Sequence, residues 1–511
     1  MKKISFSHAN EIYSCSSRVK IKEHRIGHDQ FRMYYLSLRK FERMLGETIE
    51  DVYWKSFLAP LRRYRFEMCA APLSFNEPPA TTLRSINLLS DRLTICKNIF
   101  PQFTDEAHSI FEQIKNLLNN KDNPLFDYIT SIIESDWNFK VAILVKESRL
   151  IPCFEKMLST SFHKINIIIP MQLRSGLCYQ QIVVIGPSRL YKDFDYIFDA
   201  PHANNIDIVH YNWIKDKWKQ EPVFIGYEKT KGMKTKSGIP VFGDEYIVSD
   251  ELLPKIEWSQ ISKGMHEIHS KESSHEEIMA RLLLLDWEKA VYLDAEEGSS
   301  VLIIDLYDEY TLVKRIKVNQ ITRNMFILLR TSGGGDYIVP IANRIMGTKA
   351  ENARMIQKEW KSRLREKVSK SGLLEVSIKL IDLGSEKANE INVRNWMSYR
   401  NIKTADYRDF FAIMKFVGLE NKAKGYWDVM GMIDIAHRKA GHYIRKLLLR
   451  KVQDSDLSEL QKLGKLEFEL PEMDCGSLMV IRILDMSEES FTVPVSQIAV
   501  PFELKNELWQ G

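Results

Sequence analysis

Three consecutive glycines, Gly333, Gly334 and Gly335, are the best candidate for a phosphate-binding loop in this chain. They follow a predicted strand and precede a helical segment that starts near Ile341. Glycines let a backbone approach an anion closely, and a nearby helix N-terminus adds its dipole. However, no lysine followed by serine or threonine is present to reach a terminal phosphate and its magnesium. The loop therefore predicts either an accessory phosphate contact or a flexible turn, and no nucleotide hydrolysis.

Basic residues concentrate between positions 344 and 370, where nine lysines and arginines stand against three glutamates. At helical spacing, four of them fall along one stripe: Arg354, Lys358, Lys361 and Arg365. A stripe of this kind is what an element following a phosphate backbone would present. The alternative is an ordinary solvated helix face.

A second basic helix is predicted from Ala436 to Lys446 and continues through Arg450. Ile435, Ile444, Leu447 and Leu448 could seat it on a core, which would leave five side chains outside: His437, Arg438, Lys439, Arg445 and Lys446. Two supporting helices are expected before it, and such a compact unit is compatible with a helix-turn-helix DNA-binding fold. It fits a protein-docking bundle equally well.

Only fragments of metal-dependent nuclease motifs are present. Asp305 lies on a predicted strand, but the following strand offers Lys314 without the paired acid that a PD-(D/E)xK site needs. A polar segment has a spacing like that of the HxK-plus-acid motif in phospholipase D-type nucleases: His266, His269, His275 and Glu276. It has no second copy, so we interpret it as a polar surface segment, with recruited metal as the alternative.

Two further glycine-containing stretches are weaker candidates. Lys231 to Gly238 superficially resembles a nucleotide loop, but no buried strand leads into it, which favours a solvated basic loop. Gly186-Pro187-Ser188 ends a predicted strand at the carboxyl edge of a sheet, where α/β proteins bind ligands. Many such strands simply end in a turn.

The composition is that of a folded protein without membrane spans. The 511 residues are 44% hydrophobic and 27% charged, and their apolar runs are only as long as strands. Neither a transmembrane helix nor a secretory signal is predicted. The six cysteines are scattered without a CxxC pair, which predicts free thiols in a cytoplasmic protein, with no metal site and no cofactor. The net charge of +4 is too small to indicate a polyanion partner by itself.

The chain is expected to be a multi-domain α/β protein. A helical N-terminal domain is predicted over residues 1–138. A Rossmann-like or RecA-like parallel sheet domain, degenerate and helicase-like, is predicted over 139–235, and a small β-barrel or meander over 236–340. A basic helical domain over 341–455 and a terminal β-hairpin over 456–511 would complete the chain.

Short apolar runs carry the strand predictions. The parallel sheet is expected from 141–145, 165–169, 182–185 and 206–209, because helix-length segments separate these runs. The smaller β-domain is expected from three later runs: 301–304, 312–318 and 325–329. The terminal hairpin is expected from 477–483 and 490–495.

Several stretches together resemble a known family: Leu329 to Tyr337, Ala353 to Arg365, Asn392 to Trp396, Asp409-Phe410 and Ala436 to Gly441. They are similar to the C-terminal half of DrmE-type proteins from DISARM bacterial anti-phage systems. The resemblance implies a prokaryotic defence protein that works beside a helicase, a methyltransferase or other partners encoded with it. It carries over no catalytic residues.

The leading hypothesis is a non-hydrolytic, helicase-like subunit of a defence or DNA-processing complex that binds DNA or RNA through its two basic helices. Its expected partners are nucleic acid and other defence proteins, and no membrane. One alternative is a metal-dependent nuclease assembled around Asp305 or the segment from His266 to Glu276. The other is a scaffold whose basic helices meet acidic protein surfaces.

Overall fold

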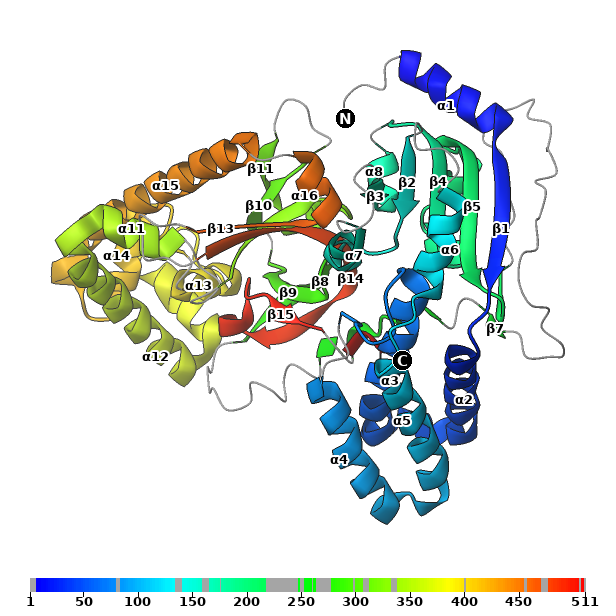
Figure 1. Cartoon of the computed structure of the whole chain (residues 1–511). Helices are drawn as coiled ribbons and strands as arrows, with labels where there is room; N and C mark the ends of the chain where they lie inside the picture. Colours follow the sequence, from blue (N-terminus) through cyan, green and yellow to red (C-terminus); the bar gives the residue numbers. More distant parts are fainter. Residues whose placement is uncertain are drawn as a thin grey trace. The chain divides into compact units, whose positions relative to one another are not determined.

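The chain forms two compact units in a computed structural model (Figure 1). Unit 1 comprises Met1–Leu328, Ser455–Leu466 and Val480–Gly511, and unit 2 comprises Leu329–Asp454 and Glu467–Met479. The structure describes these residues: 6–79, 83–133, 140–158, 165–174, 176–216, 247–248, 252–259, 261–262, 277–296, 299–306, 312–331, 338–398, 401–454, 457–469, 477–504 and 507–509.

Unit 1 contains a five-stranded sheet in which every neighbouring pair is parallel, as predicted. Its order is β1-β5-β4-β2-β3. The strands are β1 (Lys20–Ile26), β2 (Val141–Leu144), β3 (Asn166–Ile168), β4 (Tyr179–Ile185) and β5 (Ala203–Tyr211). All four residues of β2 are buried, as expected of a parallel strand covered on both faces.

Strand β1 was not predicted, because the N-terminal region was expected to be helical. It pairs with β5 from Lys20 opposite Asn205 to Ile26 opposite Tyr211. Its sequence is rich in polar and charged residues, and one of them pairs across the strands, since His24 Nε2 lies 2.7 Å from Asp207 Oδ1. An edge strand that is rich in polar residues is therefore hard to recognise from the sequence, because its partner strand lies far away along the chain.

Most of the N-terminal helices pack into the same core as the parallel sheet. They are α1 (Phe6–Arg18), α2 (Asp29–Leu45), α3 (Val52–Ala70), α4 (Leu83–Ile99), α5 (Thr104–Leu118) and α6 (Pro124–Ile133). On α2, Phe31 packs against Tyr211 and Trp213 at the end of β5, with ring centroids 5.0 and 5.8 Å apart. Residues 1–138 and the sheet thus share one hydrophobic core within unit 1. Three short helices connect the strands: α7 (Ile151–Leu158), α8 (Pro170–Leu173) and α9 (Tyr196–Asp199).

The later strands form an eight-stranded sheet of order β11-β10-β12-β14-β8-β9-β15, in which β13 also pairs with β14. The paired strands whose register is resolved are antiparallel, as predicted for this region. Its strands are β8 (Glu277–Leu285), β9 (Lys289–Asp294), β10 (Ser300–Ile304), β11 (Val313–Lys317), β12 (Phe326–Arg330), β13 (Lys465–Glu469), β14 (Ser477–Pro494) and β15 (Phe502–Glu503). A separate parallel pair joins β6 (Ile214–Lys215) to β7 (Ile247–Val248).

The predicted terminal hairpin is wrong, because its two halves belong to the single strand β14. The polar residues around Ser487 were interpreted as a turn. They instead form an irregularity in the strand, where the pairing register with β8 shifts between Met486 and Ser490. The Ser487 hydroxyl accepts from the amide of Leu282 and donates to the carbonyl of Glu489, at 3.1 and 2.8 Å. The serine thus replaces ladder contacts that the bulge interrupts.

The described helices of unit 2 are α11 (Ile338–Met346), α12 (Ala350–Asp382), α13 (Glu390–Met397), α14 (Tyr407–Phe416) and α15 (Ala423–Asp454). Their core includes Trp360, Phe410 and Met430, all fully buried. Helix α12 is interrupted at Gly372, whose φ of 79° no ordinary helix residue adopts. Helix α16 (Leu457–Leu463) belongs to unit 1. Among the described residues, no helix is long and apolar enough to cross a membrane.

Candidate nucleic-acid interface

Helix α15 has a buried apolar face and an exposed cationic face on opposite sides. Ile433, Ala436, Ala440 and Ile444 are buried at the spacing of three and four residues that defines one side of a helix. The exposed surface carries five cations, of which two pairs lie seven residues apart: Arg438, Lys439, Arg445, Lys446 and Arg450. Ile444 is buried as predicted, but Ile435, which was expected on the core side, is 56% exposed. His437, which was expected on the outer surface, contacts Arg354 instead.

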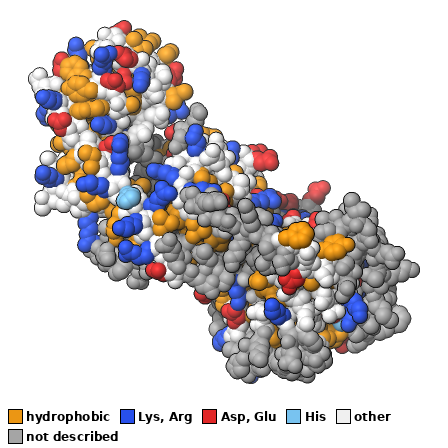
Figure 2. All heavy atoms as spheres, turned by 90° about the horizontal axis from the view of Figure 1, so that it is seen from above, with side chains coloured by type: hydrophobic (Ala, Val, Ile, Leu, Met, Phe, Trp, Pro, Cys, Tyr) orange, Lys and Arg blue, Asp and Glu red, His pale blue; other side chains and the backbone are white. Residues whose placement is uncertain are grey.

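The cationic face of α15, defined by these five residues, is low in acidic side chains. From residue 435 to residue 450 the sequence contains no aspartate and no glutamate. The nearest acid on the helix is Asp434, whose carboxylate lies 2.8 Å from the Arg438 guanidinium, and the Arg438 side chain remains 79% exposed. Lys and Arg side chains also gather over the helical part of the chain in Figure 2. Such a face can bind a polyanion through charge-assisted hydrogen bonds.

The predicted stripe on α12 has the opposite environment. The four residues do share one side of the helix, but that side borders the core of unit 2, and only Lys358 is well exposed. Lys361 is fully buried, and its ammonium donates to the carbonyls of Trp396, Ser398 and Asn401 at 2.8, 2.5 and 2.6 Å. A phosphate could reach this ammonium only by displacing all three carbonyls.

Lys361 thereby caps the C-terminus of α13. The last carbonyls of a helix have no partner inside the helix and carry the negative end of its dipole. Arg365 adds to the same cap, because its Nη2 donates to the carbonyl of Met397 at 2.7 Å. Two cations of the predicted stripe therefore stabilise a helix end and the loop that follows it.

Arg354 links three helices of unit 2. Its guanidinium donates to Asn343 Oδ1 on α11 and to Gln357 Oε1 on α12, each at 2.9 Å. It also donates to His437 Nε2 on α15 at 2.7 Å. Because arginine cannot accept, this ring nitrogen must be the acceptor and His437 must be neutral. The contacts place Arg354 behind the cationic face of α15 as a support for that helix.

The carboxyl edge of the parallel sheet was the other predicted ligand position. Neighbouring strands β2 and β4 continue toward opposite sides of the sheet, which makes their ends a switch point of the kind that binds ligands. After β4, the Ser188 amide and hydroxyl donate to the two carboxylate oxygens of Asp216, at 2.7 and 2.9 Å. Gly186 has φ +89°, and a Cβ there would lie 3.0 Å from the carbonyl oxygen of Cys69. The glycine is thus explained by close packing in this turn.

After β2, Lys146 and Arg149 are also engaged by protein groups. The Lys146 ammonium lies 4.9 Å from the ring centre of Phe194, and burial lowers its pKa. Arg149 donates to Glu67 and Glu147, at 2.5 and 2.6 Å. The side chains at this edge therefore bind one another.

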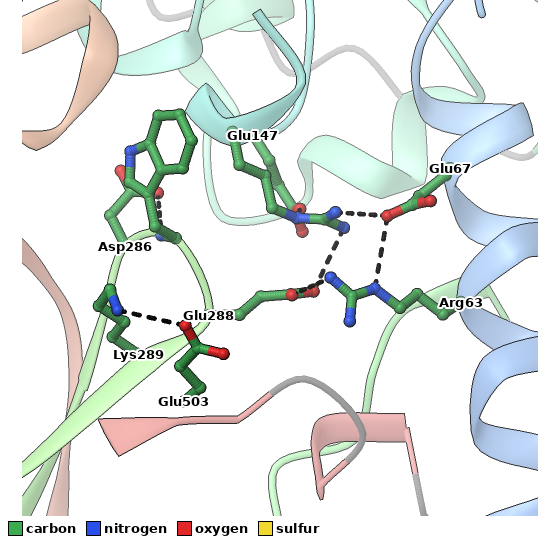
Figure 3. Close-up of polar contacts among 9 residues, drawn as sticks. Arg63, Glu67, Glu147, Asp286, Glu288, Lys289 and Glu503 are labelled. Atoms are coloured by element: carbon green, nitrogen blue, oxygen red, sulfur yellow. Dashed lines mark hydrogen bonds and ion pairs between the residues drawn. The ribbon is translucent and has the colours of Figure 1, made fainter. Parts of the chain in front are cut away.

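Figure 3 shows the ion-pair network to which Arg149 belongs. Arg63 and Glu67 come from α3, Glu147 and Arg149 follow β2, and Glu288 lies in the turn between β8 and β9. Arg63 pairs with both Glu67 and Glu288, and Arg149 Nη2 lies 3.5 Å from Glu288. Burial raises the pKa of Glu288 to about 7, although Arg149 and Arg63 act in the opposite direction. This network joins the helical region, the parallel sheet and the antiparallel sheet inside unit 1.

The nuclease candidates gain no support from the described residues. The Asp305 carboxylate is paired with the Lys314 ammonium at 2.8 Å, so the two fragments of the incomplete motif neutralise each other. Within the described ranges no group of three His, Cys, Asp or Glu side chains could hold a metal ion. Three sequence candidates lie outside the described residues: the glycines 333–335, the segment 266–276 and the basic loop 231–238.

Taken together, these features define a multi-domain α/β protein in which a parallel sheet is combined with an antiparallel sheet and a helical unit that presents one cationic helix. Residues 288–453 match the family model of the DISARM protein DrmE, C-terminal domain. The match runs from the turn before β9 into α15, and it confirms the resemblance inferred from the sequence. No curated protein and no solved structure matches the chain.

Proposed function

We propose that this protein is a nucleic-acid-binding component of a prokaryotic DISARM anti-phage system, and that the cationic face of α15 contacts the phosphates. The observation that supports the proposal best is the position of this face opposite the buried side of the helix, in a segment without acidic residues. The match of residues 288–453 to the DrmE C-terminal domain supports a defence role beside other proteins of the same system.

The parallel sheet is proposed as a helicase-like body that does not hydrolyse nucleotides. The support for this part is the parallel strand order, together with a sequence that lacks a phosphate-binding loop ending in lysine and serine or threonine. The carboxyl edge, where a nucleotide would sit in such a fold, is filled by contacts such as Ser188 with Asp216.

The test compares two triple variants in a binding assay with labelled DNA and RNA across a salt series. The first, Lys439→Gln, Arg445→Gln and Lys446→Gln, removes three cations from α15 while keeping helix propensity. The control, Lys387→Gln, Arg394→Gln and Lys415→Gln, removes three exposed cations elsewhere in unit 2. If each α15 cation contacts one phosphate, the first variant lowers the magnitude of the slope of log K against log salt by about 2.7.

At about 0.15 M salt the same arithmetic predicts roughly 100-fold weaker binding for the α15 variant and little change for the control. Equal losses in both variants would assign binding to overall charge and would refute the role of α15. Absence of nucleic-acid binding by the wild-type protein would refute the proposed function and favour the scaffold alternative. Magnesium-dependent cleavage of the substrate would favour the nuclease alternative.

A further inference from the structure

We infer, building on the proposed function, that the ligand of the cationic face of α15 is a double-stranded nucleic acid, bound through its phosphates irrespective of base sequence. The face is straight and preformed, because α15 runs from Ala423 to Asp454 as one helix whose opposite side is fixed in the core (Figure 1). A rigid row of cations fits a rigid row of phosphates without ordering a flexible strand.

The spacing of the cations fits the charge density of a duplex. Arg438 and Arg450 are about 18 Å apart along the axis, which corresponds to about five base pairs. Five cations along this length correspond to about one positive charge per base pair. A duplex carries one negative charge per about 1.7 Å of its axis, so it offers more phosphates to this row than a single strand does.

The face has no exposed phenylalanine, tyrosine or tryptophan on which a single strand could stack. Proteins that bind single strands combine a cationic groove with aromatic platforms, and each stacked base contributes about 1 to 3 kcal/mol. Between residues 435 and 450 the only phenylalanine, tyrosine or tryptophan is Tyr443, which is half-buried. The tryptophans of unit 2 are used inside it: Trp360 and Trp396 are buried, and the ring of Trp427 is covered by the Lys403 ammonium, 3.8 Å from its centre.

The composition of the face also disfavours base readout. Asparagine and glutamine, which pair with adenine, and aspartate and glutamate, which accept from cytosine, are missing from residues 435 to 450. Arg438 could pair with guanine, but its guanidinium is held by Asp434. Such a surface binds phosphates and reads little sequence.

The experiment measures the affinity of the full chain for a labelled 20-base-pair duplex, for each of its single strands, and for a second duplex of shuffled sequence. With five phosphate contacts, raising salt from 50 to 200 mM should weaken duplex binding about 500-fold and single-strand binding about 130-fold. The two duplexes should bind within about fivefold of each other, because one specific base contact alone would separate them by about that factor.

A gain-of-function variant sharpens the test. Ile435 is 56% exposed on the same face, one turn before Arg438 and Lys439. Ile435→Trp places a stacking ring there, so single-strand affinity should rise at least about fivefold while duplex affinity stays within about twofold. The matched control Ile435→Gln should leave single-strand affinity within about twofold.

The outcomes separate this inference from the proposed function. Duplex binding that exceeds single-strand binding, with the steeper salt dependence, supports the inference. Tighter binding to single strands, or a more than tenfold difference between the two duplexes, refutes it and leaves the proposed function standing. No binding to any of these nucleic acids refutes both.

Discussion

Glu288 is expected to make the protein less stable as pH rises, in spite of its two ion pairs with arginine. Its carboxylate is about 10% exposed, and burial raises its pKa to about 7. An ordinary glutamate in the unfolded chain has a pKa of about 4.3. The folded protein therefore holds a proton here between about pH 4.3 and pH 7 that the unfolded chain releases. The resulting stabilisation, roughly 3 to 4 kcal/mol, is complete below the lower value and lost as pH rises through the higher one.

The variant Glu288→Gln tests this expectation, because glutamine keeps the shape of the side chain but cannot ionise. Unfolding by urea is followed from pH 5 to pH 8 for the wild type and the variant. The free energy of unfolding of the variant, measured relative to the wild type, should rise by about 2.5 kcal/mol over this range.

A matched control is Glu503→Gln, which removes the half-exposed partner of Lys289 at 3.6 Å (Figure 3). It should change the free energy of unfolding by less than about 1 kcal/mol at every pH. If the difference between Glu288→Gln and the wild type is constant or falls with pH, the arginines outweigh burial, and the reasoning about Glu288 is refuted.

Three further predictions concern residues outside this network. Lys361→Met should lower the free energy of unfolding by about 2 to 4 kcal/mol, because it removes the donor to three carbonyls at the end of α13 and in the loop after it. The control Lys358→Met, on the same stripe, should lower the free energy of unfolding by less than about 0.5 kcal/mol. Equal effects in urea unfolding would contradict the capping role of Lys361. Burial raises the pKa of Cys178 to about 12, and the Cys15 thiol adds to the effect. At pH 8, iodoacetamide should therefore label Cys178 far more slowly in the native protein than in the unfolded chain, as measured by mass spectrometry. Equal labelling rates would show that the thiol is not perturbed. Gly186→Ala should destabilise the protein by more than about 1 kcal/mol, because Gly186 has a positive φ and lies close to the Cys69 carbonyl. Gly441→Ala, in open space on α15, should stabilise the protein by about 0.5 to 1 kcal/mol. Thermal melts that show the same sign of change for both variants would refute this account.

The sequence predicted elements well where one period of apolar residues dominates. The runs around Val141, Ile167, Ile182 and Ile206 became β2 to β5 because each is buried on both faces. The elements that were missed are those whose polar residues are satisfied by distant partners. In β1, the His24 ring pairs with the Asp207 carboxylate, and in β14, Ser487 sustains a bulge that was interpreted as a turn. No local pattern records such pairings, since they form only when the chain is folded.

The sequence also could not show which of the two groups of cations, on α12 or on α15, is exposed to a ligand. The position of the neighbouring apolar residues gives a partial indication. On α12, the stripe borders the buried side of the helix: Lys361 is followed by Leu364 three positions on and preceded by Trp360, both fully buried. On α15, the buried side is centred on Ala436 and Ala440, and the cations lie across the helix from it.

The two groups of cations differ in burial: Lys361 on α12 is fully buried, whereas the five cations of α15 are exposed. A cation beside the core can extend its ammonium to orphan carbonyls of a neighbouring helix, as Lys361 does at α13. The cations of α15 are exposed, which is why the functional proposal rests on Lys439, Arg445 and Lys446 and excludes Lys361.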